Sequence, residues 1–380
     1  MSLCVFALIA SEFLPASLLT PMASDLHVSE GLTGQGIAIS GAFAVLTSLG
    51  MPVLSGRVNR KAVLLALTAL MALSGLVVGL APNYLVYMAG RVLIGIVVGG
   101  FWSMSAASAM RLVPPHQVAR ALAIFNGGNA LATVVAPPLG IYLASFIGWR
   151  GVFLCLVPLA AAAFIWQWIA LPSMPAAPGR KSIGCVFKLL KIRLVAAGML
   201  AVGAFFMGQF AMFTYLRPFL ETVTRVDRNT LSLILLAMGM SGVIGTSFIG
   251  RFLKLGFYCT LIVIPLLMAA IGLGLTVLGS EVGTVAAMLA VWGAVGTAAP
   301  VGWWAWLAKT LPHDAEAGGG LMVAVVQLAI GLGSTVGGLL FDASGYRGTF
   351  VTSALLLLLA AILVQVTARS GHMPVAAPGP

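Results

Sequence analysis

The chain has 380 residues, of which 61% are hydrophobic and only 8% are charged, and its formal net charge is +11. So few charged residues cannot cover a soluble domain with a polar shell, which excludes a soluble globular protein and favours a chain embedded in lipid. The four cysteines lie far apart and match neither a disulfide framework nor a metal site.

A membrane span needs about 20 apolar residues, so a chain of this length with short loops holds about twelve spans. The first apolar run has no basic region before it, and we interpret it as a span and not as a cleaved signal peptide. Its abrupt start is consistent with a cytoplasmic tail missing from this sequence. The predicted spans are residues 3–23, 35–55, 62–81, 84–110, 121–146, 152–171, 195–220, 231–252, 258–278, 283–311, 318–341 and 349–368.

The longest polar stretch, rich in Pro, Lys and Arg, separates these spans into two sets of six. We therefore predict an all-α membrane protein with two six-helix bundles. The first bundle covers residues 1–171 and the second covers residues 195–369. A cytoplasmic linker, 172–194, joins them, and a cytoplasmic tail, 370–380, follows.

The distribution of basic residues predicts the orientation of the chain. With both termini in the cytoplasm, the inner loops hold nearly three times as many Lys and Arg residues as the outer loops. Short cytoplasmic loops carry such an excess in membrane proteins. The net charge of +11 is therefore explained by topology, without a nucleic-acid partner. The bases assigned to outer loops are Arg150, Arg217, Arg225, Arg228 and Arg347.

The two halves of the chain also resemble each other. The string Gly148-Trp149-Arg150-Gly151-Val152-Phe153 recurs as Gly345-Tyr346-Arg347-Gly348-Thr349-Phe350, at an offset of 197 residues (345 − 148). Six spans repeated in the same orientation predict a transporter, with a substrate site at the midplane between two halves that rock for alternating access. At the same offset, Glu12, Phe13, Ser17 and Pro21 align with Gln209, Phe210, Thr214 and Pro218.

Three motif regions make the chain resemble the major facilitator superfamily. The loop from Ser55 to Lys61 is similar to the family's basic loop after the second span, although Asn59 stands where an acid is usual, with Arg60 beside it. Span four carries Gly90-Arg91-Val92-Leu93-Ile94-Gly95, similar to a motif built on a buried arginine. Span five carries Pro137 and Pro138, and Ala136-Pro137-Pro138-Leu139-Gly140 resembles the proline motif of the drug:proton antiporter group.

The resemblance carries several implications for function. Longer strings are similar to those of bacterial exporters of purine ribonucleosides in that group, among them Glu12-Phe13-Leu14-Pro15, Gly99-Gly100-Phe101-Trp102 and Pro300-Val301-Gly302-Trp303. This implies export of nucleosides such as inosine and guanosine in exchange for protons, across the bacterial inner membrane. It also implies a gating role for Asn59 and Arg60, and a leak-preventing bend at Pro137 and Pro138.

Glu12 is the only acid, and Arg91 the only base, inside a predicted span. A charge in the bilayer costs about 2.5–3.5 kcal/mol and usually marks an ion pathway. Burial favours the neutral acid and a nearby cation favours the carboxylate, so Glu12 could load a proton outside and release it inside. We therefore assign proton coupling to Glu12 and Arg91, which interact directly or through water. Alternatively, Glu12 lies in water at the end of a short span, and Arg91 binds backbone carbonyls.

A nucleoside site needs aromatic rings for stacking and a few amides or hydroxyls in an apolar cavity. Each candidate aromatic could instead be core or face lipid, and each amide could find its partner in another helix. The candidates on the expected spans are Phe13, Trp102, Asn126, Asn129, Gln209, Phe210, Phe213, Trp303 and Gln327.

Other classes of protein fit the sequence less well. A channel does not need two repeated halves. An intramembrane enzyme needs a buried catalytic group, yet all four histidines, His27, His116, His313 and His372, fall in loops or the tail. Export of a sugar or a drug by the same fold remains the main alternative. We expect a monomer that is driven by the proton gradient, with no cofactor.

Overall fold

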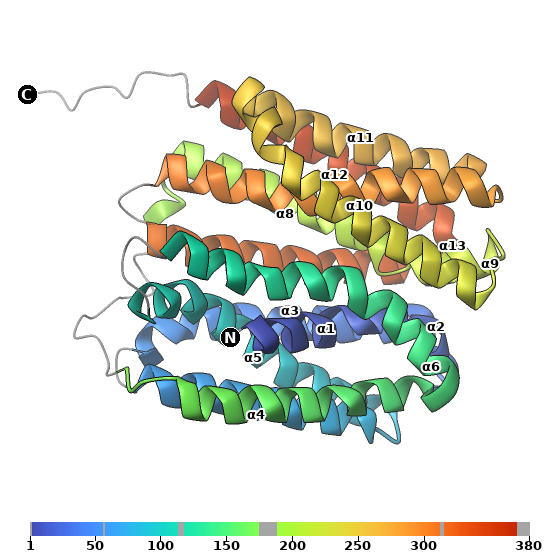
Figure 1. Cartoon of the computed structure of the whole chain (residues 1–380). Coiled ribbons are helices and arrows are strands. Elements are labelled where there is room, and N and C mark those ends of the chain that lie inside the picture. The colour runs from blue at the N-terminus through green and yellow to red at the C-terminus, as the bar shows by residue number, and fades with distance from the viewer. Residues whose placement is uncertain (1, 56–57, 113–117, 175–187, 312–314, 371–380) are drawn as a thin grey trace, which may run out of the picture.

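The computed structural model describes the chain except residues 1, 56–57, 113–117, 175–187, 312–314 and 371–380, and it gives no side chains for 52–55, 105–112, 118–127, 130 and 315–316. Every regular element in the described residues is a helix (Figure 1). The helices are α1 (Ser2–Ser17), α2 (Leu19–Leu26), α3 (Glu30–Ser55), α4 (Arg60–Gly79), α5 (Tyr84–Leu112), α6 (Val118–Ala170), α8 (Arg193–Phe213), α9 (Leu216–Thr222), α10 (Arg228–Leu255), α11 (Phe257–Leu278), α12 (Val282–Thr310) and α13 (Ala315–Ser370).

Two of these helices, α6 and α13, are helical pairs that turn back at a glycine. Gly148 has φ 68° and ψ 169°, and Gly345 has φ 69° and ψ −167°, a backbone region that is essentially restricted to glycine. Each glycine ends one span and begins the next, and Figure 1 shows α6 reversing its direction. The repeat predicted from the sequence is therefore confirmed in the backbone, because the two glycines lie at its offset of 197 residues (345 − 148).

Two other spans are broken in matching positions. The axis of α1 and α2 bends by 69° at Leu18. In the second half, α8 and α9 meet at Thr214 and Tyr215. Leu18 has φ −111° and ψ 15°, and Tyr215, at the repeat offset, has φ −106° and ψ 14°. Broken helices expose backbone polar groups inside the membrane, which transporters use at their binding sites.

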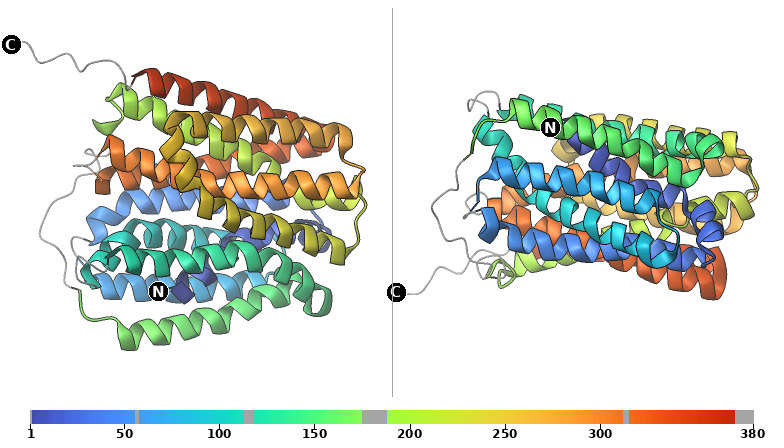
Figure 2. Two further views of the ribbon diagram at one scale, coloured as in Figure 1. Left: turned by 45° about the horizontal axis from the view of Figure 1, so that its top comes forward. Right: turned by 90° about the horizontal axis from the view of Figure 1, so that it is seen from below.

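The described helices account for twelve membrane crossings, as predicted. Nine of the described helical segments are long and apolar enough to span a bilayer, and the bent pair α1–α2, counted as one span, makes ten. The span regions of α6 and α13 contain 40 and 54 residues, which exceeds one crossing of about 20 residues. Since each of these helices reverses at its glycine, each crosses twice. Both ends of the described chain lie on one side of the molecule (Figures 1 and 2).

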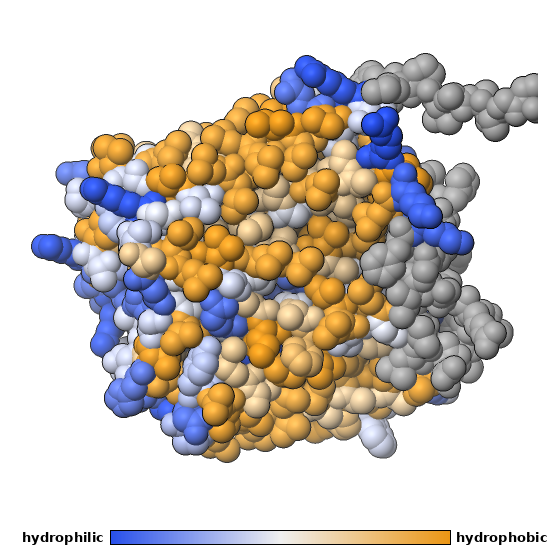
Figure 3. Space-filling view, turned by 180° about the vertical axis from the view of Figure 1, so that it is seen from behind, coloured by the Kyte–Doolittle hydropathy of each residue, from blue (hydrophilic) through white to orange (hydrophobic). Residues whose placement is uncertain are grey.

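The surface has the polarity that a bilayer requires. Figure 3 shows a broad hydrophobic band, with hydrophilic residues at its two ends. Many large apolar side chains are exposed on the surface of the molecule, among them Trp166, Ile169 and Val277. One end of the molecule is formed by residues 27–29, Gly148, 223–227 and Gly345. The distribution of basic residues predicts that this end faces outwards. We call it the outer end.

The two sets of six spans pack against each other through a few helices. Helix α3 of the first set lies along α13 of the second, and α6 contacts α10. One hydrophobic core belongs mainly to the second set, and two others belong to the first. The division into bundles at the linker 172–194 stays a prediction, because much of the linker lies outside the described residues.

Candidate functional site

A cleft lies where the two sets of spans face each other. It contains about 600 Å³ of space not filled by atoms, a volume that includes open solvent. Helices α1 and α6 contribute to it from the first half, and α8, α10 and α12 from the second. The lining residues are Phe13, Thr133, Pro137, Gln209, Phe210, Phe213, Leu235, Met238, Gly239, Trp292, Gly293 and Thr297.

Three phenylalanines form an aromatic cluster in this cleft. The ring of Phe13 stacks on that of Phe210 with centroids 5.8 Å apart and planes 22° apart. Phe213 packs edge-on against both, at 6.2 Å from Phe13 and 5.7 Å from Phe210. Because Phe13 belongs to the first half and the other two to the second, rocking of the halves must change these contacts. The three predicted aromatics are therefore brought together in one place.

Gln209 supplies the cleft with an amide. Its Oε1 atom is buried and has no hydrogen-bond partner among the described residues. A buried acceptor that lacks a donor costs about 1–3 kcal/mol, so a ligand with an N–H or O–H group at this point would relieve that cost. The cleft thus combines aromatic faces with an unsatisfied amide, as predicted for a flat polar ring.

Glu12 is buried between the two halves and contacts the second one. Its side chain is 7% exposed, which places it away from water. Its carboxylate Oε1 accepts a hydrogen bond of 3.2 Å from Nε2 of Gln327 on α13, while Oε1 of Gln327 has no partner in the part of the chain that the structure describes. Phe13, the next residue in the chain, lines the cleft. The only acid predicted inside a span therefore lies beside the cleft, paired with an amide from the opposite half.

Arg91 lies within electrostatic range of the Glu12 carboxylate but makes no direct hydrogen bond to it in the described residues, and an interaction through water stays a prediction. Its guanidinium donates to the backbone oxygens of Ser11 at 2.8 Å and Gly36 at 3.0 Å, and to Oγ of Ser40 at 3.0 Å. It reaches only the backbone oxygen of Glu12, at 3.5 Å.

The cause of this arrangement is a proline in α1. Pro15 has no N–H, so the carbonyl of Ser11, four residues earlier, lacks its helical donor and takes one from Arg91. Arg91 is only 1% exposed. Arg91 therefore donates to the unpaired backbone of a broken helix, which is the alternative interpretation of the sequence. Its part in proton coupling stays a prediction.

The remaining substrate candidates lie elsewhere. Trp303 is buried in the core of the second half, where its ring packs against Trp306 at 6.0 Å. Trp102 packs on a core of the first half. Asn129 is half-buried on α6 and is not part of the cleft lining. The side chain of Asn126 lies outside the described residues.

The predicted gating residues fall into two groups. Asn59 caps α4 by accepting from the N–H of Lys61 at 2.9 Å, and its amide donates to Oγ of Ser173 at 2.8 Å. Arg60 is buried, and its N–H donates to the oxygen of Met174 at 2.9 Å. These contacts stay within the first half and the start of the linker.

Pro137 and Pro138 are both buried in the first limb of α6, and Pro137 lines the cleft. Pro137 cannot donate to the carbonyl of Thr133, one turn earlier, whose side chain also lines the cleft. The proline motif therefore belongs to the wall of the cleft. Whether it limits leak stays a prediction.

Sequence reasoning missed seven of the twelve residues that line the cleft, among them Trp292, Thr133 and Thr297. Trp292 lies inside an apolar run, where an aromatic has no distinguishing signal. The two threonines are polar and lie inside spans, so the argument applied to intramembrane amides could have found them.

Sequence reasoning also placed Arg217 in an outer loop. The structure corrects this, because Arg217 is 7% exposed and lies in α9. In the described residues no three His, Cys, Asp or Glu side chains cluster as a metal site would require.

Comparison with known proteins agrees with this geometry. The model of the Major Facilitator Superfamily matches residues 1–318. The transcription regulatory protein OpdE of Pseudomonas aeruginosa is 63% identical over 372 residues, covering 97% of this chain and 92% of that protein. The purine ribonucleoside efflux pump NepI of Salmonella enteritidis is 40% identical over 367 residues, covering 96% of this chain and 92% of the pump.

Solved structures share the fold at low sequence identity. The human organic anion transporter MFSD10 (TETRAN) has a TM-score of 0.68 and 18% identity, covering 96% of this chain and 98% of its own. A bacterial homologue of the human lysosomal transporter Spinster, solved in an inward-facing and unoccupied conformation, has a TM-score of 0.73 and 14% identity, covering 97% and 96%. The twelve crossings, the repeat and the family match together lead to one conclusion: this chain is a multi-pass membrane transporter of the Major Facilitator Superfamily, not an enzyme.

Proposed function

We propose that this transporter exports purine ribonucleosides such as inosine and guanosine in exchange for protons, as a monomer in the bacterial inner membrane. The observation that carries the proposal is the cleft between the halves, where an aromatic cluster and an amide oxygen without a partner in the described residues lie beside the buried acid Glu12. The 40% identity to a purine ribonucleoside efflux pump over nearly the whole chain supports the same substrate class.

The composition of the cleft favours a nucleoside over the alternative substrates. A purine base has a flat face that stacks on phenylalanine, and stacking of a base on an aromatic side chain contributes about 1–3 kcal/mol. Its edge carries N–H donors that suit the free oxygen of Gln209. A sugar would need many more polar partners than this apolar lining offers, and a cationic drug would need a negative charge that a proton-carrying Glu12 could not keep. Sugars and drugs nevertheless remain the alternative substrates to be tested.

Glu12 and Gln327 suggest how proton binding could be linked to movement of the halves. An ionised Glu12 can only accept, and Nε2 of Gln327 donates to it. A protonated Glu12 carries an O–H that could donate to the free Oε1 of Gln327. Protonation would thus change a contact between the two halves at the edge of the cleft. This change would couple the proton to alternating access.

The name of the relative at 63% identity raises a second role, in the control of transcription. We infer that any such effect would arise from transport, through the cytoplasmic concentration of a solute that a regulator senses. A reporter gene that responds to this chain should then lose its response when transport is abolished by Glu12→Gln. A response that survives the substitution would instead indicate regulation by protein contact.

The test uses purified protein in proteoliposomes with an acidic lumen and labelled inosine outside. Protons that leave should drive inosine inwards through wild-type protein. Because one proton exchanged for a neutral nucleoside moves one charge, a potential that is positive inside should speed this uptake. Glu12→Gln should abolish accumulation but keep the exchange of labelled for unlabelled inosine. The matched control is Glu281→Gln, which neutralises an exposed acid at the start of α12.

Two results would contradict parts of the proposal. If folded protein moves neither inosine nor guanosine but accumulates a sugar or a cationic drug, the substrate class is wrong. If Glu12→Gln accumulates inosine like the wild type, the proton site lies elsewhere, and Arg91 is the next residue to test.

A further inference from the structure

Asp342 joins the two halves at the outer end. It lies on α13, before the reversal at Gly345, and its carboxylate accepts a hydrogen bond of 2.5 Å from Oγ of Ser29 and one of 3.0 Å from the N–H of Gly31. Ser29 and Gly31 flank the first residue of α3, so Asp342 caps a helix of the opposite half. The first N–H groups of a helix have no partner within the helix and carry partial positive charge, which a carboxylate neutralises.

Gly31 lets this contact form. A Cβ atom at Gly31 would lie only 2.2 Å from Oδ2 of Asp342, so a larger residue would push the carboxylate away. Tyr215 reinforces the same junction, because its hydroxyl donates to the oxygen of Ser334 at 2.9 Å and lies 3.5 Å from the oxygen of Gly31. Slightly deeper, Oγ1 of Thr335 donates to Gln35 at 3.0 Å, again across the two halves.

Arg217 makes a second junction of the same kind. Its guanidinium donates to the backbone oxygen of Ser17 in the first half, and its Nε pairs with Glu221 at 2.8 Å. Pro21 has no N–H and follows Ser17 by four residues, so the carbonyl of Ser17 has no helical donor. Side chains of the second half thus satisfy two unpaired backbone groups of the first, an N–H at Gly31 and a C=O at Ser17.

We propose that Asp342, supported by Arg217, is the latch that closes the outer end of the transporter between cycles. Release of substrate to the outside requires α3 and α13 to separate there. The N–H of Gly31 and the C=O of Ser17 must then exchange their protein partners for water. The latch makes that separation unfavourable until the halves rock. The inference uses the transport fold but not the identity of the substrate.

Carboxylates on both sides of the junction oppose the latch. Glu30, on the first half, lies within electrostatic range of Glu221 and Asp342 on the second, with Arg217 as the cation among them. Like charges on opposite halves repel each other, so the closed state is a balance between the capping bonds and this repulsion. Removal of a capping bond of Asp342 should therefore favour opening of the outer end. Removal of the repelling charge on Glu30 should favour its closure.

The test measures access to the cleft from outside, without substrate. The parent protein carries Thr297→Cys in the cleft and has Cys155, Cys185 and Cys259 replaced by serine. A membrane-impermeant maleimide is added to spheroplasts, and the labelling rate is measured. Asp342→Ala should raise this rate about ten-fold, in line with the loss of a charged cap. Ser29→Ala should raise it less, and Glu30→Gln should lower it.

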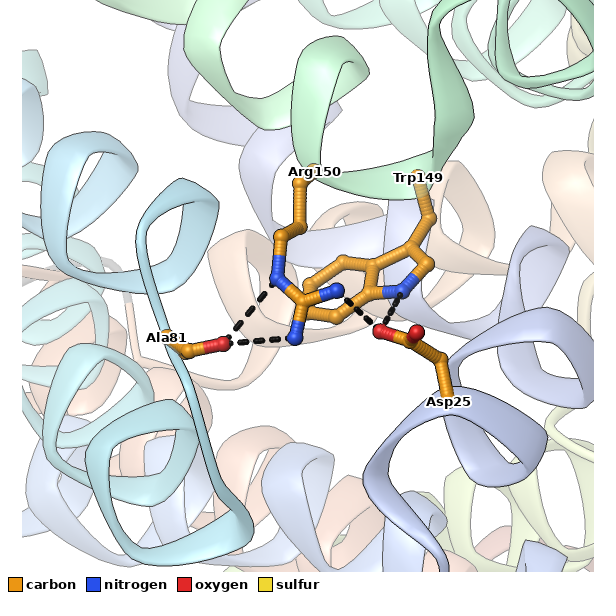
Figure 4. A network of polar contacts seen from close by, with 4 residues as sticks. All are labelled: Asp25, Ala81, Trp149 and Arg150. Carbon is orange, nitrogen blue, oxygen red and sulfur yellow. Dashed lines mark hydrogen bonds and ion pairs between the residues drawn. The ribbon is translucent and has the colours of Figure 1, made fainter.

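The control is Asp25→Ala, at the same end of the molecule. The carboxylate of Asp25 binds Arg150 and the indole N–H of Trp149, while Arg150 also donates to the oxygen of Ala81, so the whole network lies within the first half (Figure 4). Its loss should leave the labelling rate unchanged. A rate that does not rise in Asp342→Ala, or that rises equally in Asp25→Ala, would overturn the proposal.

A crosslink tests the latch even if Asp342→Ala does not fold. Ser29→Cys combined with Asp342→Cys places two thiols at the junction, and mild oxidation by copper phenanthroline joins them, with oxygen as the final oxidant. Transport should stop on oxidation and return on reduction. Continued transport by fully crosslinked protein would show that this junction does not need to open. Each single cysteine variant controls for effects of the oxidant.

Discussion

The two halves of this transporter share a backbone but differ in the side chains that carry chemistry. Leu18 and Tyr215 break equivalent spans with nearly the same dihedral angles, and Gly148 and Gly345 reverse equivalent helices. Yet Glu12 in the first half corresponds to Gln209 in the second. The duplicated part of the sequence therefore specifies the fold and the aromatic pair Phe13 and Phe210, whereas diverged positions such as Glu12 and Gln209 supply different polar groups in the two halves.

The arginine of span four illustrates this difference. In the first half, Arg91 donates to the carbonyl of Ser11, which Pro15 leaves unpaired. At the repeat offset, the second half has Met212 in place of Pro15 and Met288 in place of Arg91. With an N–H at position 212, the carbonyl of Gly208, the counterpart of Ser11, has a helical donor and needs no cation. The proline and the arginine therefore form one unit.

The largest effect should come from breaking this unit. Arg91→Met removes the donor for Ser11, Gly36 and Ser40 and should lower the free energy of unfolding by about 3 kcal/mol, because buried acceptors lose their partners. Pro15→Met in addition restores an N–H to Ser11 and should recover about 1 kcal/mol. Thermal unfolding followed by tryptophan fluorescence measures both. No recovery in the double variant would show that Arg91 does not compensate for Pro15.

The reversal glycines test whether the halves are equivalent in backbone energetics. Gly148→Ala and Gly345→Ala should each destabilise the protein by about 1–3 kcal/mol, because alanine is strained at these dihedral angles. A Cβ atom at either position would meet nothing within 4 Å, so packing cannot contribute.

Gly50→Ala and Gly250→Ala are the matched controls, since a Cβ atom there also meets nothing within 4 Å and both residues are helical. These controls should be neutral or stabilising. Clearly unequal costs at Gly148 and Gly345 would mean that the two reversals are not equivalent.

The aromatic pair at equivalent positions should contribute to substrate binding from both halves. Phe13→Ala and Phe210→Ala should each raise the half-saturating inosine concentration about ten-fold, since each loses a stacking face. The double variant should fall short of the product of the single effects, because the two rings contact each other. Phe248→Ala, which removes an exposed ring on α10, is the control and should have no effect.

The smallest effect should come from Asp25. The repeat aligns it with Thr222, so the second half has no acid at this position, and the guanidinium of Arg347 lies 5.9 Å from the ring of Tyr346. Asp25→Thr should cost less than about 1 kcal/mol, because the ion pair with Arg150 is partly exposed. If thermal unfolding shows a loss of stability well above this value, the contacts of Asp25 with Arg150 and Trp149 hold the helices of the first half together.

The spans and the repeat could be predicted from the sequence because both depend on local patterns. Apolar length sets each span, and the string around Gly148 and its copy at Gly345 marks each reversal. Phe13, Phe210 and Phe213 could be proposed for one site, since the repeat aligns Phe13 with Phe210 and Phe213 follows Phe210 by about one helical turn.

Contacts between distant helices could not be predicted in the same way. Gln327 is 315 residues from Glu12 in sequence, and only the packing of α13 brings its amide to the carboxylate. Arg91 donates to the carbonyl of Ser11, which lacks a helical donor only because Pro15 follows it by four residues. Trp292 has no polar signature within its apolar run. Arg217 was assigned to a loop because it is charged, whereas the structure gives it a carbonyl partner and buries it.

The glycine reversals also have a consequence for how the chain enters the membrane. Spans five and six, like spans eleven and twelve, are joined without a loop, so each pair must insert as a helical hairpin whose tip crosses the bilayer. Each tip carries one arginine, Arg150 or Arg347, and Arg150 finds its acidic partner only after α2 is in place. Asp25 precedes this hairpin in the chain, so α2 is synthesised first and its carboxylate is available when the tip that carries Arg150 reaches the outer side.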